Sequence, residues 1–330
     1  MSLVIPSGRR LETHRLDERI AVREVGLPIS RRGESVTFLR ALSMCSGIPA
    51  SDLVVFSYFL CAVPLRLQNL FGVNRRVLYF VQENEPLAFG TFGQRYRSAK
   101  KALASWSLRS RYVYVCNSTY VRDFLWGTYR RRARIVFPGV DRRVFKPLPD
   151  RGESRHPSVA VVTRRTEAKG WSMLVATLGR LTQLRPDVQI VAISPERLVE
   201  LSSLDARIAW HHPHSDDEVA EAFRSATIFF SCSRVEGFGL PVLESMAVGT
   251  PVVATDSQGV RDVLEHGRNG VLVPYGDAEL AAKAIDALLC DVRRWEAYRV
   301  AGLATAQKFS WENFDRDLVS IVEEMASAYA

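Results

Sequence analysis

Residues 233–244 hold the residue types best suited to chemistry and read Ser-Arg-Val-Glu-Gly-Phe-Gly-Leu-Pro-Val-Leu-Glu. Glu236 and Glu244 lie on either side of a Gly-Phe-Gly turn, and Pro241 follows the turn. Proline favours the first position of a helix, because its ring fixes φ and the N–H that it lacks would be unpaired there. The apolar residues 228–230 before the motif predict a buried strand. A strand, a glycine turn and a helix start direct free backbone N–H groups and the positive end of a helix dipole at one place, which can bind a phosphate.

The two glutamates indicate what surrounds that phosphate. Carboxylates in contact with a phosphate would repel it, so we expect them to accept hydrogen bonds from hydroxyl groups on either side. A ligand that carries phosphate between two polyols is a nucleotide-sugar. The alternative is an ordinary turn between a strand and a helix, with both glutamates in solvent, since isolated Gly-x-Gly sequences are common.

The second half of the chain alternates predicted strands and helices. Strands are expected at residues 158–163, 188–193, 208–210, 227–231, 251–254 and 270–273. Helices are expected at residues 170–184, 216–225, 241–248, 259–265 and 277–289, with Ser215 capping the second. Apolar strands separated by helices predict a parallel sheet covered on both faces. Ligands of such sheets bind beyond the carboxyl ends of the strands, where the motif falls.

The motif resembles that of the retaining glycosyltransferases of family four, which carry Glu-x7-Glu in the second half of a GT-B fold. The resemblance continues through residues 247–255 and 265–273, and it covers about residues 135 to 320 well. It implies an α/β fold of two Rossmann-like domains facing a cleft. The N-terminal acceptor domain would comprise residues 1–147 together with a last helix at about 311–330 that packs back on it. The donor domain would comprise residues 148–310.

A basic stretch follows the strand expected at residues 158–163. Family-four enzymes carry Gly-Arg-Leu and then Lys-Gly at this place, and the resemblance assigns Arg164 and Lys169 to the donor diphosphate, with Thr163 where glycine is usual. Cations here would stabilise the negative charge that the departing nucleotide gains in the transition state. Two basic surface residues after a strand are the alternative interpretation.

The same resemblance gives roles to the glutamate motif. Glu236 would contact the transferred sugar and, with Arg164 and Lys169, form the catalytic set. Glu244 would contact the ribose. The donor-binding residues expected at the turn and the helix start are Gly237, Phe238, Gly239, Leu240 and Glu244.

The first half of the chain also predicts an α/β domain, although it resembles the family only loosely. Strands are expected at residues 53–60, 77–81, 111–116 and 135–137, and helices at residues 39–44, 94–106 and 118–126. GT-B N-terminal domains usually open with a hydrophobic strand and a glycine-rich loop, whereas residues 1–6 lead directly into charged residues. We therefore expect a reduced N-terminal domain.

Two further segments offer weaker candidates. Residues 82–86, Gln-Glu-Asn-Glu-Pro, resemble a run in bacterial polysaccharide and rhamnosyl transferases, so Glu83 or Glu85 would orient the acceptor hydroxyl or contact the donor. A charged strand–loop junction is an equal alternative. The His-His-Pro-His run at residues 211–214 suggests metal ligands, but its spacing fits no closed site, so we expect no metal and place His214 on the nucleobase side of the cleft.

Charge and cysteine content limit the kinds of partner and the compartment that the protein can have. Residues 1–150 contain 25 Lys/Arg and 11 Asp/Glu, a net of +14, whereas the remainder contains 19 and 25, a net of −6, for +8 in all. The basic half permits an anionic or lipid-linked acceptor and contact with a membrane face, or a solvated arginine-rich surface. Nucleic acid is not expected, because no nucleic-acid-binding motif accompanies the charge. Five scattered cysteines, no secretory signal and no apolar run long enough to span a bilayer predict a soluble cytoplasmic protein, peripheral to the inner membrane face at most.

These features favour a retaining, metal-independent glycosyltransferase that moves a sugar from a nucleotide-sugar to an acceptor hydroxyl, in bacterial polysaccharide, glycolipid or glycoside synthesis. No cofactor is expected beyond the donor itself. The alternative is a GT-B relative that binds a nucleotide-sugar without transferring it, or a GT-B epimerase or phosphorylase. Release of nucleotide from the donor distinguishes a transferase from a binding module.

Overall fold

The computed structural model describes residues 2–6, 21–25, 53–63, 65–66, 76–88, 94–148, 156–194, 201 and 207–327. The chain divides into two compact units. Unit 1 consists of Met1–Val115 and Phe124–Arg134, and unit 2 of Cys116–Asp123 and Ile135–Ala330. The domain boundary at residue 147 and the packing of the last helix on the first domain stay predictions.

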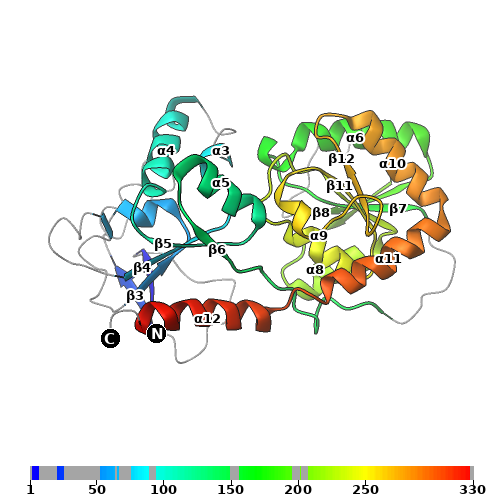
Figure 1. The fold of residues 1–330 in the computed structure, drawn as a ribbon. Helices are drawn as coiled ribbons and strands as arrows, with labels where there is room; N and C mark the ends of the chain where they lie inside the picture. Colours follow the sequence, from blue (N-terminus) through cyan, green and yellow to red (C-terminus); the bar gives the residue numbers. More distant parts are fainter. Residues whose placement is uncertain are drawn as a thin grey trace. The chain divides into compact units, whose positions relative to one another are not determined.

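Unit 2 is built on a six-stranded sheet in the order β12-β11-β10-β7-β8-β9, and each pair of neighbouring strands is parallel (Figure 1). The strands are β7 (Ser158–Val162), β8 (Gln189–Ile193), β9 (Arg207–His211), β10 (Ile228–Ser231), β11 (Val252–Thr255) and β12 (Val271–Val273). Their side chains alternate between two apolar clusters: Val161 and Phe230 belong to one, and Ala160 and Phe229 to the other. Both faces of the sheet are therefore buried, as continuous apolar strands predict.

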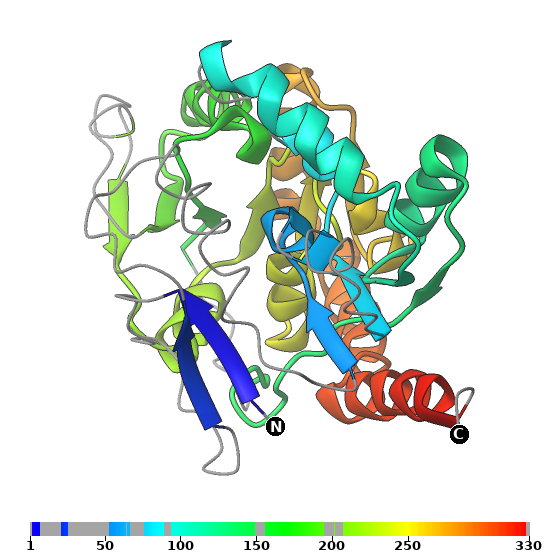
Figure 2. The same cartoon turned by 90° about the vertical axis from the view of Figure 1, so that its left-hand side faces the viewer.

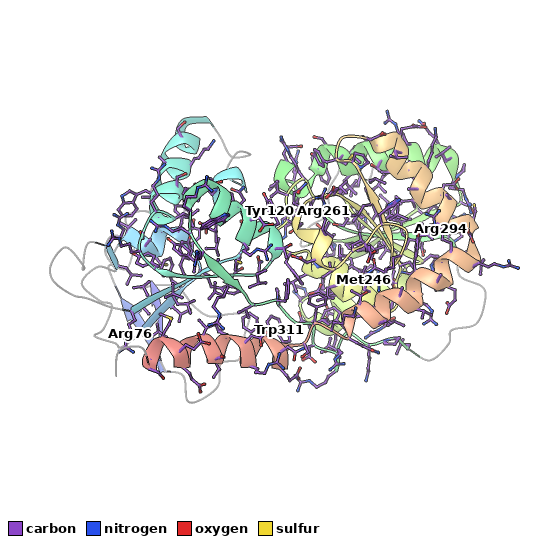
Figure 3. The ribbon with its side chains drawn as sticks, viewed as in Figure 1. Arg76, Tyr120, Met246, Arg261, Arg294 and Trp311 are labelled. Carbon is purple, nitrogen blue, oxygen red and sulfur yellow. The ribbon has the colours of Figure 1, made fainter. Side chains whose placement is uncertain are left out.

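Helices cover both faces of this sheet. They are α6 (Trp171–Leu184), α8 (Asp216–Ser225), α9 (Leu240–Ala247), α10 (Ala278–Cys290) and α11 (Val292–Ala306), and α12 (Trp311–Ser327) ends the described chain. The cluster of Val161 includes residues of α6 and α10, and that of Ala160 includes residues of α8 and α9. Helix α11 approaches α9 closely at Gly302, where an added Cβ would lie 3.3 Å from Cγ of Met246 (Figure 3). The glycine lets the two helices pack closely, and a larger side chain there would require Met246 to shift.

The principal sheet of unit 1 has four strands in the order β3-β4-β5-β6. These are β3 (Leu53–Phe56), β4 (Arg76–Val81), β5 (Val113–Cys116) and β6 (Ala133–Ile135), accompanied by α3 (Glu85–Ala88), α4 (Gln94–Ser107) and α5 (Thr119–Tyr129). Tyr79 is fully buried and stacks on Phe56, with ring centroids 4.3 Å apart. Figure 2 shows a second, parallel pair formed by β1 (Ser2–Pro6) and β2 (Ala21–Val25). The sheet β3-β4-β5-β6 is smaller than the sheet of unit 2, in agreement with a reduced N-terminal domain.

Several predicted elements differ from the structure. The strand expected at residues 53–60 ends at Phe56, because the chain turns into a 3-10 helix, η2 (Phe59–Cys61), with the Cys61 N–H bonded to the Tyr58 carbonyl. The helix expected at residues 259–265 is a short 3-10 turn, η5 (Gly259–Asp262). Helix α11 was not predicted, since charged and apolar residues are mixed around it. The helix expected at residues 39–44 lies outside the described residues.

Within the described ranges, no helix is both long and apolar enough to cross a membrane. Cys61, Cys116, Cys232 and Cys290 are free thiols.

Candidate functional site

The candidate site lies where the strand order of unit 2 reverses. From β7 the chain proceeds outward to β8 and β9, returns to β10 beside β7, and then continues to β11 and β12 on the other side. The loops after β7 and β10 therefore leave the sheet in opposite directions, and ligands of such sheets bind at a switch point of this kind. The first loop carries Arg164 and Lys169, and the second carries residues 232–239. The topology thus brings together the two segments that the sequence singled out.

Lys169 and Glu236 are in direct contact across this switch point. The Lys169 ammonium donates to both carboxylate oxygens of Glu236, at 2.9 and 3.0 Å. The Lys169 side chain is 31% exposed and that of Glu236 16%, so a ligand can reach the pair. The Ser233 hydroxyl donates to Glu236 Oε1 at 2.7 Å. Ser233 is a site residue that the sequence did not reveal, because serine three positions before glutamate is also a common helix-start pattern.

Main-chain contacts fix the two loops to each other. The Ala168 carbonyl accepts from the N–H groups of Arg234 and Val235, at 3.0 and 3.3 Å. Gly170 has a left-handed φ of +72°, and a Cβ added to it would lie 1.8 Å from the Cys232 carbonyl oxygen. Glycine is therefore the residue that fits where the loops cross.

Replacing Gly170 with alanine should destabilise unit 2 by about 2–4 kcal/mol, because it adds backbone strain and forces the loops apart. Gly267→Ala is the matched control, since Gly267 has a φ of +79° but nothing within 4 Å of an added Cβ. That control should be destabilised by the backbone strain alone, by about 1–2 kcal/mol. Denaturant unfolding measures both changes, and equal losses would contradict the close crossing of the loops.

Helix α9 supplies the amide groups of the site. Gly239, with a φ of +99°, is its N-cap, so the helix starts at Leu240 and Pro241 is its second residue rather than its first as predicted. The amides of Phe238, Gly239 and Leu240 have no hydrogen-bond partner within the described part of the chain. The Phe238 ring is buried, with its centroid 6.0 Å from that of Phe137. Phe238 can therefore offer only its backbone to a ligand.

A third loop, after β11, lies against the backbone of Glu236. The Glu236 N–H donates to the Ser257 carbonyl at 3.2 Å, and a Cβ added to Gly259 would lie 2.3 Å from the Gly237 carbonyl oxygen. Between them, Gln258 has a φ of +69° and a ψ of −67°, and the Gly259 N–H donates to the Ser257 carbonyl at 3.0 Å. This is a strained three-residue turn, of the kind that clusters at functional sites. No sequence pattern beyond the Ser-Gln-Gly triplet at residues 257–259 indicates this turn.

Two further residues that the sequence assigned to the donor, Glu244 and Arg164, have no bonded side-chain partner among the residues that the structure describes. Glu244 lies in α9, is half-buried and forms no side-chain hydrogen bond with a described residue. Burial, with a smaller contribution from the Asp216 charge, raises the pKa of Glu244 to about 7. Arg164 is exposed, and its guanidinium contacts no polar group of the described residues. A carboxyl and a guanidinium without partners are both available to a ligand.

The weaker candidates, His214, Glu83 and Glu85, differ in location and exposure. His214 is exposed, and its backbone N–H donates to Glu218 at the start of α8. In unit 1, Glu83 is half-buried, whereas Glu85 is 5% exposed and accepts from the Tyr79 hydroxyl at 2.7 Å. Burial raises the pKa of Glu85 to about 7. Glu85 is thus a core carboxyl in this structure, not a residue of an open loop. No group of three potential metal ligands occurs among the described residues.

Comparison with known proteins relates the second half of the chain to a known family. Residues 150–302 match the sequence profile of the family described as glycosyl transferases group 1. The second half of the chain belongs to this family. Over 244 residues it is 31% identical to the alpha-maltose-1-phosphate synthase of Mycolicibacterium smegmatis, an alignment that covers 64% of the chain. The chain spans 62% of that relative's length, less than two thirds.

Solved structures that superpose on most of the chain define the fold. A sucrose-phosphate synthase from Thermosynechococcus elongatus superposes with a TM-score of 0.84 at 18% identity, covering 99% of this chain and 89% of that chain. Anabaena HepE in complex with UDP-glucose superposes with a TM-score of 0.72 at 16% identity, covering 92% and 86%. The predicted α/β GT-B fold is confirmed. Its arrangement around a cleft stays a prediction.

Proposed function

We propose that the protein is a retaining glycosyltransferase that uses a nucleotide-sugar donor, and that UDP-glucose is a donor it accepts. The observation that carries the proposal is the Lys169–Glu236 pair at the topological switch point, beside three unused amides at the start of α9. The match of residues 150–302 to glycosyl transferases group 1 supports the reaction class. The UDP-glucose complex of Anabaena HepE, which has the same fold, supports the nucleotide and the sugar.

The charges on the site suit the departing nucleotide. As the bond between the sugar C1 and the phosphate oxygen breaks, the diphosphate gains negative charge. Lys169, Arg164 and the α9 amides would already be in place when that charge develops. Preorganised groups of this kind lower the barrier because they stabilise the charge without having to move. Glu236 would accept hydrogen bonds from the sugar hydroxyls, and Glu244 from the ribose.

Retention requires the acceptor to attack the face that the phosphate leaves. The acceptor oxygen forms the new bond to C1, and its proton passes to the departing phosphate oxygen, so no protein base is required on that face. The net charge of +14 over residues 1–150 supports an anionic acceptor.

Binding of UDP-glucose should depend on pH through Glu244. Its pKa of about 7 means that the carboxylate form, the better acceptor for ribose hydroxyls, is gained as pH rises through neutrality. The diphosphate of UDP-glucose stays ionised throughout this range. Calorimetric titration should therefore give affinities that weaken by up to about tenfold per unit as pH falls below the pKa.

Glu244→Gln is the matched control, because it keeps the shape of the side chain and cannot ionise. We expect this variant to bind UDP-glucose more weakly at high pH and with no pH dependence. Wild-type protein that binds no nucleotide-sugar, or binds one without ever releasing nucleotide in the presence of acceptors, would contradict the proposed transfer.

A further inference from the structure

The densest positive charge of the chain lies outside the donor site. Residues 94–135 contain eleven Lys/Arg and one acidic residue, Asp123, a net of +10, which exceeds the +8 of the whole chain. Asp123 pairs with Arg122 at 2.8 Å. The segment runs from α4 through β5 and α5 to β6, and its charge has no role in the proposed chemistry.

The end of α5 presents an aromatic side chain within this charge. Trp126 is 47% exposed, although tryptophan usually buries most of its surface. The guanidinium carbons of Arg130 and Arg132 lie 5.8 and 5.9 Å from the centroid of its rings, within the range of cation–π attraction. An exposed indole with two guanidinium groups beside it combines an apolar body with positive charge.

The backbone places further arginines on the same surface. Arg132 and Arg134 are exposed at two-residue spacing, as alternation along the extended segment into β6 requires, and Arg130 is exposed just before them. Arg131, between them, bonds to the Arg109 carbonyl and thereby joins this segment to the α4–β5 loop, where Arg109 and Arg111 are exposed. We define the Trp126 patch by its six exposed members, all in unit 1: Arg109, Arg111, Trp126, Arg130, Arg132 and Arg134.

One arginine of this patch, Arg130, occupies a backbone position where glycine would be less strained. Arg130 ends α5 with a left-handed φ of +54°, and its N–H donates to the Trp126 carbonyl at 3.1 Å. Helices commonly place glycine at such an end, since other residues are strained there. An arginine at position 130 places its guanidinium near the Trp126 ring, in addition to that of Arg132.

We propose that the Trp126 patch docks unit 1 on a bilayer that contains anionic phospholipids. Tryptophan and arginine are the side chains that suit the boundary between head groups and acyl chains, because each has an apolar body and a polar end. A basic patch is drawn to the negative surface potential of such a bilayer. Arginines that only keep an edge strand soluble would not require an exposed tryptophan among them.

Vesicle cosedimentation of the full chain tests this docking without donor or acceptor, so it is independent of the proposed sugar transfer. The probes are vesicles of phosphatidylcholine alone and of phosphatidylcholine with about 30% phosphatidylglycerol, at about 0.1 M salt. We expect binding to the anionic vesicles only. The triple variant Arg130→Gln/Arg132→Gln/Arg134→Gln should bind on the order of 100-fold more weakly, because each arginine near the surface strengthens binding about fivefold. Trp126→Ala should weaken binding at least fivefold, and Trp126→Phe less.

A charge-matched control separates the patch from net charge. The triple variant Arg142→Gln/Arg207→Gln/Arg293→Gln removes three exposed arginines from unit 2 and should change binding less than threefold. Circular dichroism checks that every variant is folded. Equal losses in both triple variants, no binding of wild-type protein to anionic vesicles, or tighter binding to a short DNA duplex than to the vesicles would each overturn the proposal.

Discussion

Lys169→Ala should lower kcat/KM for UDP-glucose by about 10²–10³-fold, measured as the initial rate of UDP release. Lys169 is held at the switch point by two hydrogen bonds to Glu236, so its ammonium is fixed before the donor arrives. In a site of reduced exposure a fixed cation stabilises a departing diphosphate more than a solvated one does. The loss should fall on kcat as well as on KM, since the charge on the nucleotide grows in the transition state.

The matched control for this variant is Lys283→Ala. Lys283 lies on α10 and also contacts a glutamate, with its ammonium 3.1 Å from Glu279, but its side chain is 63% exposed. An exposed pair of this kind contributes little to stability, so kcat/KM should not change by more than about twofold. If Lys169→Ala affected the rate no more than Lys283→Ala, the proposed donor site would be wrong.

Most strands and helices of unit 2 could be predicted from the sequence because their pattern is regular. Its strands are short apolar runs between amphipathic helices, and both features appear in a single sequence. The N-cap at Ser215 is an example, since its hydroxyl accepts from the Glu218 N–H as predicted. The start of α9 was misplaced by one residue, because Pro241 is tolerated in the second helical position as well as the first.

The parts that the sequence did not predict depend on contacts between distant segments. Lys169 and Glu236 are 67 residues apart, and only the strand order brings them into contact. The strained turn at Gln258 is set by the backbone of Glu236 rather than by its own residue type. After its strand, Glu85 could face an open loop or the core; the structure packs it inward on Tyr79, and its role at the site stays a prediction. Position along the chain cannot distinguish these two outcomes.

Glu236→Gln should have two opposed effects, which follow from the pairing of Glu236 with Lys169. Both oxygens of Glu236 accept from Lys169, so a diphosphate must compete with that carboxylate for the ammonium. The neutral amide leaves Lys169 without a charged partner in a partly buried place, and a bound diphosphate relieves this. UDP, which has no sugar, should therefore bind the variant about 5- to 30-fold more tightly, equivalent to about 1–2 kcal/mol.

Sugar transfer should change in the other direction. Glu236 would hold the sugar hydroxyls through its charge, and a neutral amide makes weaker hydrogen bonds, so kcat for UDP-glucose should fall by about 10²-fold. Glu279→Gln, which removes the partner of Lys283, serves as the control and should alter neither quantity. Calorimetry with UDP and rate measurements with UDP-glucose separate the two effects. Unchanged or weaker binding of UDP by Glu236→Gln would mean that Lys169 does not exchange a carboxylate for the diphosphate, and the role given to the pair would have to be abandoned.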